Sequence, residues 1–433
     1  SIENVVIFDE IINNEDIVIV PRLTFWATYE APKILGKKII LVDVDEDYQL
    51  NINLVRELIK NHKVKVIITV HLYGIVSNNY NKLVEICDEN NIILMEDSSQ
   101  AFGSIYDNKN ILSNSYISCV SMYPTKIYGS CGNSGFIVTS DDYLANKMRS
   151  YRDNGRKDTR YDHYFIAGNF VMDTINAIYN LNKLTYINDI INNTSFKFEL
   201  YQKELSDLNL LKIPNLTNQI PNGFNFILKC LVPHKRNRII LDLKKNNIAA
   251  SVIYPKFIDQ QEGYQKNNDD LLLSCNDSLC QDIFSIPIYY DLKAIEQLNV
   301  IKNIYQNDKI NTVLIGCGNM GSKHLKNLIN NDKFNLIGYL DKVDYNLETQ
   351  YIENLDDNID FALISTSTQS HFEWAIKCIE KKIHILIEKP ALIDFEQYNN
   401  ISQLSEKFNI RVGVSMIERY NKFIEPINLE KID

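Results

Sequence analysis

Short apolar runs alternate with amphipathic stretches along the first 140 residues of the chain. Segments 53–62 and 79–91 repeat apolar residues at the three-to-four spacing of a helix, whereas the apolar runs between such segments have the length of buried strands. The predicted strands are IVIVP (17–21), KIILVDV (38–44), VKVIITV (64–70), IILMED (92–97), ISCVSMY (117–123) and GFIVTS (135–140). This alternation predicts an α/β fold with a largely parallel sheet covered by helices.

The pattern changes twice further along the chain. Residues 142–205 are mostly helical in pattern, and a smaller α+β portion follows, with strands expected in FILKCLV and ASVIYP and a helix between them. After a short polar stretch near residue 308 the alternation restarts, with strands expected in TVLIG, NLIGYLD, DFALIST and HILIEKP. The expected domains are a large domain over 1–205, a small domain over 206–306 and a Rossmann-like domain over 310–433.

The composition is that of a globular protein and argues against two classes of partner. Hydrophobic residues make up 45% of the 433 residues and charged residues 23%. The net charge of −10 argues against nucleic acid or an anionic membrane as the main partner, and no apolar run approaches the roughly 20 residues of a membrane helix. The eight cysteines are scattered without zinc-type spacing, so we expect no metal site and a reducing, cytoplasmic location.

The candidate chemistry of the first half lies at the ends of predicted strands. Lys126 follows one strand in SMYPTKIYG, and Asp97 closes another in IILMED. In open α/β sheets ligands collect at the carboxyl edge of the strands. A pyridoxal phosphate enzyme needs a lysine for the Schiff base and an acid that keeps the pyridine nitrogen protonated. By itself, Lys126 also fits a solvated lysine in a turn.

Several motifs, in order, resemble the DegT-type nucleotide-sugar aminotransferases, a fold type I pyridoxal phosphate family. The motifs are VPRLTFWAT (20–28), VDVDEDYQLN (42–51), HLYG (71–74), EDSSQAFGS (96–104), SCVSMYPTKIYGSCGNSG (118–135), RSYRDNG (149–155), GNFVMD (168–173), SVIYP (251–255) and IFSIPIY (283–289). The resemblance covers about residues 1–305. It implies the large domain and the small α+β domain of the fold type I transferases, with a nucleotide sugar as substrate.

The resemblance also implies roles for individual residues. Lys126 would form the Schiff base, and Asp97 would face the pyridine nitrogen. The remaining contacts implied are Phe25 stacked on the ring, Gln100 at the phenolic oxygen, Ser121 at the phosphate, and Asn169 at the phosphate of the neighbouring subunit's cofactor. The last contact implies a homodimer. Lysine rather than histidine at position 126 favours transamination over the chemistry of the related dehydratases. Taken singly, Phe25, Ser121 and Asn169 also fit a core residue, a strand residue and a turn residue.

Three positions depart from the family pattern. The glycine–threonine loop that binds the cofactor phosphate should fall where the chain reads Ser1-Ile2-Glu3. Asn133-Ser134 replaces an Asp-Gly pair, and Val171 stands where arginine is usual. These departures leave two interpretations, a fragment that lacks the family's N-terminal segment or a degenerate cofactor site.

A second set of motifs begins at residue 311. Gly316, Gly318 and Gly321 have the G-x-G-x-x-G spacing between a strand and a helix, and Asp341 ends the next strand, where a carboxylate favours NAD over NADP. With STSTQSH (365–371) and ILIEKPA (385–391), this part resembles the Gfo/Idh/MocA oxidoreductases. The resemblance places Glu388 and Lys389 beside the nicotinamide. It takes RYNKFIEP (419–426) as the segment that leads into the family's substrate-binding domain, which would begin at about residue 425 and which we expect to be missing from this chain. We expect His324 and His371 to be capping or packing residues.

Two functions of different classes follow from these motifs. The first is transamination of a keto nucleotide sugar, with glutamate as the expected amino donor, fused to an NAD-binding oxidoreductase module. The two activities fit together, because oxidation of a sugar hydroxyl supplies the ketone that transamination consumes. The expected products are amino sugars for surface polysaccharide. The second is a catalytically incomplete fusion that acts as a binding or scaffold protein and retains both folds.

Overall fold

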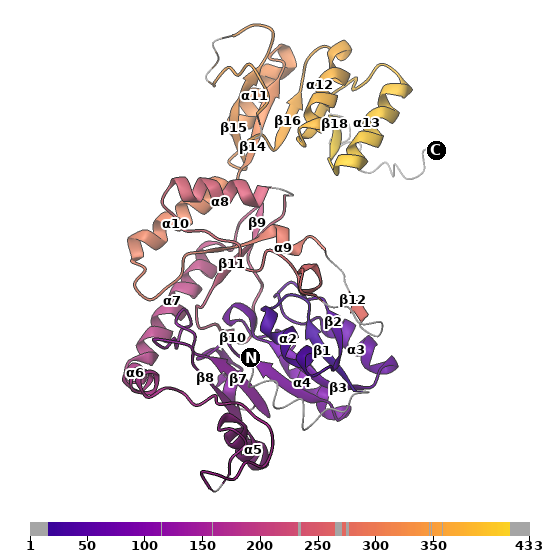
Figure 1. Cartoon of the computed structure of the whole chain (residues 1–433). Coiled ribbons are helices and arrows are strands. Elements are labelled where there is room, and N and C mark those ends of the chain that lie inside the picture. Colours follow the sequence, from indigo (N-terminus) through magenta and orange to yellow (C-terminus); the bar gives the residue numbers. More distant parts are fainter. Residues whose placement is uncertain are drawn as a thin grey trace. The chain divides into compact units, whose positions relative to one another are not determined.

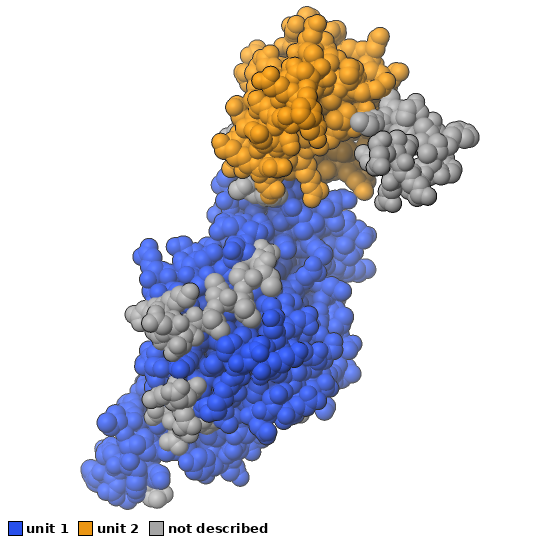
Figure 2. All heavy atoms as spheres, turned by 90° about the vertical axis from the view of Figure 1, so that its right-hand side faces the viewer, with its two compact units in different colours: residues 1–304 blue, residues 305–433 orange. Residues whose placement is uncertain are grey.

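The chain divides into two compact units, residues 1–304 and 305–433, which Figure 2 colours separately. The structure is a computed structural model that describes residues 16–113, 115–157, 159–232, 235–264, 271–273, 277–345, 347, 349–356 and 358–415. The expected phosphate-loop position at residues 1–3 and the segment 419–426 lie outside the described residues. The bounds of the three domains expected from the sequence stay predictions.

Unit 1 is built on a seven-stranded sheet in the order β12-β2-β1-β3-β4-β7-β8 (Figure 1). The strands are β1 (Ile17–Pro21), β2 (Lys38–Val42), β3 (Val64–Val70), β4 (Ile93–Asp97), β7 (Ile117–Ser121), β8 (Gly135–Thr139) and β12 (Leu271–Leu273). Neighbouring strands are parallel except β7 and β8, which are antiparallel. The six strands predicted before residue 140 are confirmed, and β12 was not predicted.

Helices connect the parallel strands and cover the sheet, as the sequence pattern predicts. They are α2 (Trp26–Ile34), α3 (Ile52–Asn61) and α4 (Tyr80–Glu89). Alternate residues of each strand enter different cores because successive side chains point to opposite faces. Ile19 and Ile40 pack with residues of α3 and α4, whereas Val18 and Leu41 join the larger core on the other face.

The larger core continues into the second half of unit 1. There a three-stranded antiparallel sheet has the order β13-β11-β9. Its strands are β9 (Leu211–Lys212), β11 (Phe226–Cys230) and β13 (Ile283–Ile286), with helices α5 (Asp142–Arg152), α6 (Thr174–Leu184), α7 (Ile187–Glu204), α8 (Lys235–Lys245), α9 (Leu279–Asp282) and α10 (Ala294–Asn307) nearby in the chain. A third small sheet joins β5 (Ile105–Tyr106), β6 (Lys109–Asn110) and β10 (Gln219–Ile220).

The strand predicted in ASVIYP is wrong. Only Ser251 pairs, through an isolated bridge to Ser285, and the backbone at Tyr254 has a φ of +61°. A left-handed residue interrupts a strand, because extended backbone requires negative φ.

Unit 2 is a five-stranded parallel sheet in the order β15-β14-β16-β17-β18 with helices between its strands. The elements are β14 (Ile310–Ile315), α11 (Asn319–Ile329), β15 (Phe334–Leu340), β16 (Phe361–Ile364), α12 (Thr368–Glu380), β17 (His384–Glu388), α13 (Phe395–Phe408) and β18 (Val412–Ser415). The four predicted strands are confirmed, and β18 was not predicted. Within the described residues of both units, no helix has the length and apolar character needed to cross a membrane.

Candidate active site

The loop after β7 carries Lys126 and is closed by hydrogen bonds of its own backbone. The Lys126 N–H donates to the Tyr123 carbonyl (2.9 Å), and the Gly129 N–H donates to the Lys126 carbonyl (2.8 Å). Glycine is required at position 129 because a Cβ atom there would lie 2.4 Å from the Pro124 carbonyl oxygen. The sequence therefore folds here into a compact turn at the end of a sheet strand.

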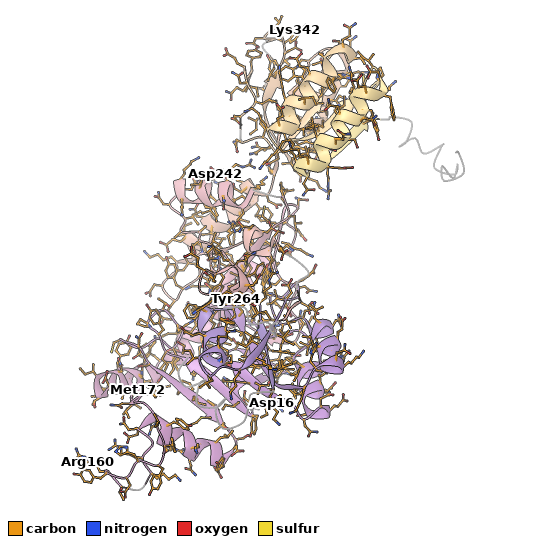
Figure 3. The ribbon with its side chains drawn as sticks, turned by 45° about the vertical axis from the view of Figure 1, so that its right-hand side comes forward. Asp16, Arg160, Met172, Asp242, Tyr264 and Lys342 are labelled. Carbon is orange, nitrogen blue, oxygen red and sulfur yellow. The ribbon has the colours of Figure 1, made fainter. Side chains whose placement is uncertain are left out.

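Helix α6 holds this loop in place. Lys183 donates from Nζ to the Gly129 carbonyl (2.9 Å), and the Tyr128 hydroxyl donates to the Asn180 carbonyl (3.0 Å). Asn180 and Lys183 are three residues apart and so share one face of the helix. Met172, labelled in Figure 3, packs against the cluster that contains Tyr128. The lysine loop is thus fixed from its own backbone and from a neighbouring helix.

The Lys126 ammonium is half-buried and has no hydrogen-bond partner among the described residues. It lies over the Phe224 ring, 4.7 Å from the ring centroid. Burial lowers the pKa of Lys126, and the negative charge of Asp97 opposes this shift. A lysine that loses its proton more easily is a better nucleophile toward a carbonyl group.

Asp97 is the last residue of β4, and two donors fix its carboxylate. Oδ2 accepts from the Thr28 hydroxyl (2.9 Å), and Oδ1 accepts from the Ser99 N–H (3.1 Å). Thr28 is fully buried and its hydroxyl also meets that of Thr24 at 3.0 Å, so α2 and the residues before it orient the carboxylate. The motif TFWAT therefore places a hydroxyl on Asp97, a role that the sequence analysis missed.

Gln100 follows Asp97 by three residues and is buried, with both ends of its side-chain amide engaged. Its Oε1 accepts from the backbone N–H of Tyr73 (2.6 Å), and its Nε2 donates to the Tyr254 hydroxyl (2.7 Å). Burial raises the pKa of Tyr254 to about 12, while the Gln100 hydrogen bond opposes and the Asp97 charge adds to the shift. Tyr254 is therefore a neutral phenol near pH 7, and its closeness to Asp97 links Gln100 to the same site.

The other three predicted cofactor residues have different surroundings. Ser121 ends β7, is half-buried, and accepts from the Tyr123 N–H (3.3 Å). Phe25 precedes α2 and is 60% exposed, so it is not a core residue. Asn169 lies in an exposed loop, where its Oδ1 accepts from the Val171 N–H, and no hydrogen bond in the described part of the chain joins it to Lys126.

A buried network lies beside the strand end that carries Asp97. The His71 ring Nε2 and the Glu96 carboxylate are 2.8 Å apart, and the Tyr80 hydroxyl donates to Glu96 (2.9 Å). The backbone N–H of His71 also donates to the backbone carbonyl of Asp97 (3.0 Å). The histidine of the HLYG motif thus supports the end of β4. Its partners lie on the neighbouring strand, so its role becomes clear only when β3 and β4 are seen paired.

In unit 2 the glycine loop between β14 and α11 brings backbone segments into close contact with each other. Gly316 has a φ of +92°, and a Cβ atom at Gly321 would lie 2.0 Å from the Gly316 carbonyl oxygen, so the turn itself requires both glycines. A Cβ atom at Gly318 would have no atom within 4 Å, which leaves open space at the start of α11. Asp341 follows β15, and its Oδ2 accepts from the Cys317 N–H (2.6 Å). The structure therefore brings Asp341, the residue predicted to bind the ribose hydroxyls, beside the glycine loop.

Two hydroxyl groups beside this loop fit a polar ligand. Ser365 and Thr366 follow β16, and their hydroxyl oxygens are buried without a partner among the described residues. A Cβ atom at Gly316 would lie 2.7 Å from the backbone of both residues, so they line the loop. Buried hydroxyls without partners are uncommon and are often completed by a ligand or by water. These groups fit the hydroxyl and phosphate oxygens of a dinucleotide.

Glu388, which ends β17, is tied to α11. Its Oε1 lies 2.6 Å from His324 Nε2 and its Oε2 accepts from the Lys389 N–H (3.2 Å). Burial acts to raise the pKa of Glu388, but hydrogen bonds from His324 and Ser415 lower it below its usual value. Lys389 is exposed. His324 thus holds the glutamate that the family resemblance places at the nicotinamide, and the sequence did not predict this pairing.

Comparison with known proteins identifies both parts of the chain. Residues 9–305 match the DegT/DnrJ/EryC1/StrS aminotransferase family, and residues 310–416 match an oxidoreductase family with an NAD-binding Rossmann fold. One relative, UDP-2-acetamido-2-deoxy-3-oxo-D-glucuronate aminotransferase of Pseudomonas aeruginosa, is 30% identical over 288 residues, which are 65% of this chain and 77% of the relative. The resemblances inferred from the sequence motifs are therefore confirmed.

Solved structures agree with the fold of unit 1. A DegT/DnrJ/EryC1/StrS aminotransferase from Brucella abortus is 25% identical and superposes with a TM-score of 0.64 over 70% of this chain and 82% of its own. The Bacillus subtilis protein NtdA, solved with the cofactor PMP, is 22% identical and has a TM-score of 0.62 over 71% of each chain. The α/β fold class predicted from the sequence is confirmed for both parts.

Proposed function

Since this chain belongs to the DegT/DnrJ/EryC1/StrS aminotransferase family, we propose that it transfers an amino group to a keto sugar carried by a nucleotide. The observation that supports the proposal is the half-buried ammonium of Lys126, whose pKa is affected by the negative charge of Asp97. Burial lowers the pKa of Lys126, and the negative charge of Asp97 opposes this shift. Asp97 is the last residue of β4, the strand paired with β7. A structural lysine would instead be paired or solvated.

The residues at this strand edge fit pyridoxal phosphate. When bound, the cofactor supplies an electron sink for negative charge at the substrate carbon. Lys126 would hold it covalently, the fixed carboxylate of Asp97 would face the ring nitrogen, and the exposed ring of Phe25 would be free to stack on it. Ser121 would donate its hydroxyl to the phosphate, and Gln100 would donate an amide N–H to the ring oxygen.

Lys126 also fits the role of moving protons. Its Nζ has no acceptor in the described part of the chain, so a bound substrate would be its first partner. A base works best when its pKa lies near the working pH, and burial moves the pKa of Lys126 in that direction. We assign it the transfer of a proton between neighbouring atoms of the substrate.

The substrate class follows from chemistry and from relatives. The Pseudomonas aeruginosa relative is named for amino transfer at a UDP-linked 3-oxo sugar. We propose a keto nucleotide sugar as the acceptor and glutamate as the amino donor, within a cytoplasmic pathway to amino sugars of surface polysaccharide. The fused Rossmann domain would use NAD to oxidise a sugar hydroxyl, so that one reaction supplies the ketone for the other.

The exposed face of α6 supports a homodimer. Ile175, Ile178 and Leu181 are 76%, 64% and 66% exposed and lie on the helix that braces the lysine loop. Apolar side chains gathered on one helix are typical of a surface covered by another chain. We expect a dimer in which Asn169 reaches the partner's cofactor. Light scattering of the full chain should give twice the chain mass at micromolar concentration, and a monomer would contradict this assignment.

The function is tested by mapping where pyridoxal phosphate attaches. The full chain is incubated with pyridoxal phosphate, reduced with borohydride, digested and analysed by mass spectrometry. The proposal requires the label on Lys126 and amino transfer from glutamate to a keto nucleotide sugar. Labelling spread over surface lysines, without a new absorption band, would instead favour the alternative of a binding fusion without turnover.

The glycine loop of unit 2 gives a separate prediction for NAD. Gly321→Ala should destabilise the chain by about 1–3 kcal/mol, because the new methyl group collides with the Gly316 carbonyl. Gly318→Ala should leave stability unchanged, since its Cβ has open space, but should weaken NAD binding about tenfold by filling the space the cofactor needs. Chemical denaturation and calorimetric titration with NAD measure the two effects. Equal NAD affinity in wild type and Gly318→Ala would contradict the assignment.

A further inference from the structure

Three tyrosines of unit 1 have left-handed backbone conformations. The φ angles are +65° at Tyr48, +64° at Tyr73 and +61° at Tyr254. A bulky side chain in this region costs about 1–3 kcal/mol and persists only where the surroundings enforce it. The three rings come from separate segments, yet the Tyr73 ring contacts both others, with centroids 5.8 Å apart for Tyr48 and Tyr73 and 6.1 Å apart for Tyr73 and Tyr254.

Two of these strained tyrosines converge on one side chain. The N–H of Tyr73 donates to Gln100 Oε1, and Gln100 Nε2 donates to the Tyr254 hydroxyl. A flipped amide would set its nitrogen against the Tyr73 N–H, so the two contacts allow a single orientation. The backbone carbonyl of Gln100 also accepts from Asn222 Nδ2 (2.8 Å), which fixes the backbone that carries the side-chain amide.

The segment that carries Tyr254 is clamped to the end of β1. Arg22 donates from Nε and Nη2 to the two oxygens of Asp259 (2.7 and 3.0 Å). The Ile258 N–H donates to the Arg22 carbonyl (3.1 Å), and the guanidinium lies 4.1 Å from the centroid of the Phe257 ring. A paired charge and a stacked ring of this kind can sustain local backbone strain. The hydroxyl of Tyr254 is therefore held at a fixed point against Gln100.

We propose that Tyr254 is a positioning residue that holds the Gln100 amide with its nitrogen toward the active site. One N–H of the Gln100 amide donates to the Tyr254 hydroxyl, and the second remains to donate to the phenolic oxygen of the cofactor. This inference rests on the proposed function, because pyridoxal phosphate provides that oxygen. Tyr254 itself need not touch the cofactor, since it acts through Gln100.

The proposal predicts a spectroscopic change in Tyr254→Phe. Donation from Gln100 stabilises negative charge on the ring oxygen and so lowers the pH at which bound pyridoxal phosphate changes its absorption band. Without the Tyr254 hydroxyl the amide is less well oriented, and this transition should rise by about half to one pH unit. Cofactor affinity should fall severalfold. Absorption spectra recorded against pH, and equilibrium binding of pyridoxal phosphate, measure both effects.

Tyr73→Phe is the matched control. Tyr73 has the same backbone strain, is fully buried, and its hydroxyl has no partner among the described residues, so its loss should leave the transition unchanged. Gln100→Leu should raise the transition as well, and Tyr254→Phe added to it should have no further effect, because residues that act through one contact are not additive.

Each other outcome overturns the inference or its premise. A Tyr254→Phe variant that titrates as wild type does, or that adds fully to Gln100→Leu, shows that Tyr254 does not act through Gln100. A Tyr254→Phe variant that fails to fold also overturns it, because the role assigned is orientation of one side chain. Wild-type chain without any pH-dependent cofactor band would instead refute the proposed function.

Discussion

Replacing Lys126 by alanine is expected to lower amino transfer by at least about 10⁴-fold, because the variant loses both the covalent attachment and the proton-transferring group. The absorption band of bound pyridoxal phosphate should disappear, and borohydride should no longer label the peptide that contains residue 126. The measurements are turnover with glutamate as the donor, absorption spectroscopy and peptide mapping. Unchanged absorption in Lys126→Ala would contradict the assignment.

The same variant should not be less stable than wild type in the absence of cofactor. Burial lowers the pKa of Lys126 in the folded chain, so the unfolded chain binds more protons between the folded and unfolded pKa values. The buried ammonium therefore costs stability below its folded pKa, and the cost disappears as the pH rises toward the unfolded value. Lys126→Ala removes this cost at pH 7. Lys109→Ala, at an exposed lysine of β6, is the control and should keep activity and label.

Much of the fold and the position of the lysine could be predicted because both depend on local sequence. Buried strands are short apolar runs, and Asp97 and Lys126 lie at the ends of two of them, which are paired in one sheet. The glycine spacing of unit 2 is equally local, since Gly316 and Gly321 meet within one turn. Where reactive side chains lie at the ends of strands, the pattern that predicts the strands also predicts the edge of the sheet at which those side chains meet.

The partners of these residues could not be predicted, because they are distant in the chain. Thr28 reaches Asp97 across 69 residues, and Arg22 reaches Asp259 across 237. ASVIYP has the apolar content of a strand, yet the contact of Tyr254 with Gln100 accompanies a backbone angle that no strand allows. β18 is only four residues long, with a glycine among them, so its pairing with β17 outweighs its weak local pattern.

Replacing Asp97 by asparagine is expected to lower amino transfer by about 10²–10³-fold while the cofactor stays covalently attached. Asparagine has nearly the same shape and can still accept from the Thr28 hydroxyl. It carries no negative charge, however, so it cannot keep a proton on the ring nitrogen, and the cofactor loses most of its capacity to take up electrons. Turnover, absorption spectra and borohydride labelling of Lys126 should therefore separate this variant from Lys126→Ala.

Glu96→Gln is the control for Asp97→Asn, because it changes a neighbouring buried carboxylate of the same strand. Glu96 bonds His71 and Tyr80 instead of Thr28, so its loss should lower the free energy of unfolding by about 1–3 kcal/mol without changing the cofactor spectrum. If Asp97→Asn and Glu96→Gln reduced turnover equally, the effect of Asp97 would be structural. A large loss confined to Asp97→Asn, with the label retained on Lys126, requires a charge that acts on the cofactor itself.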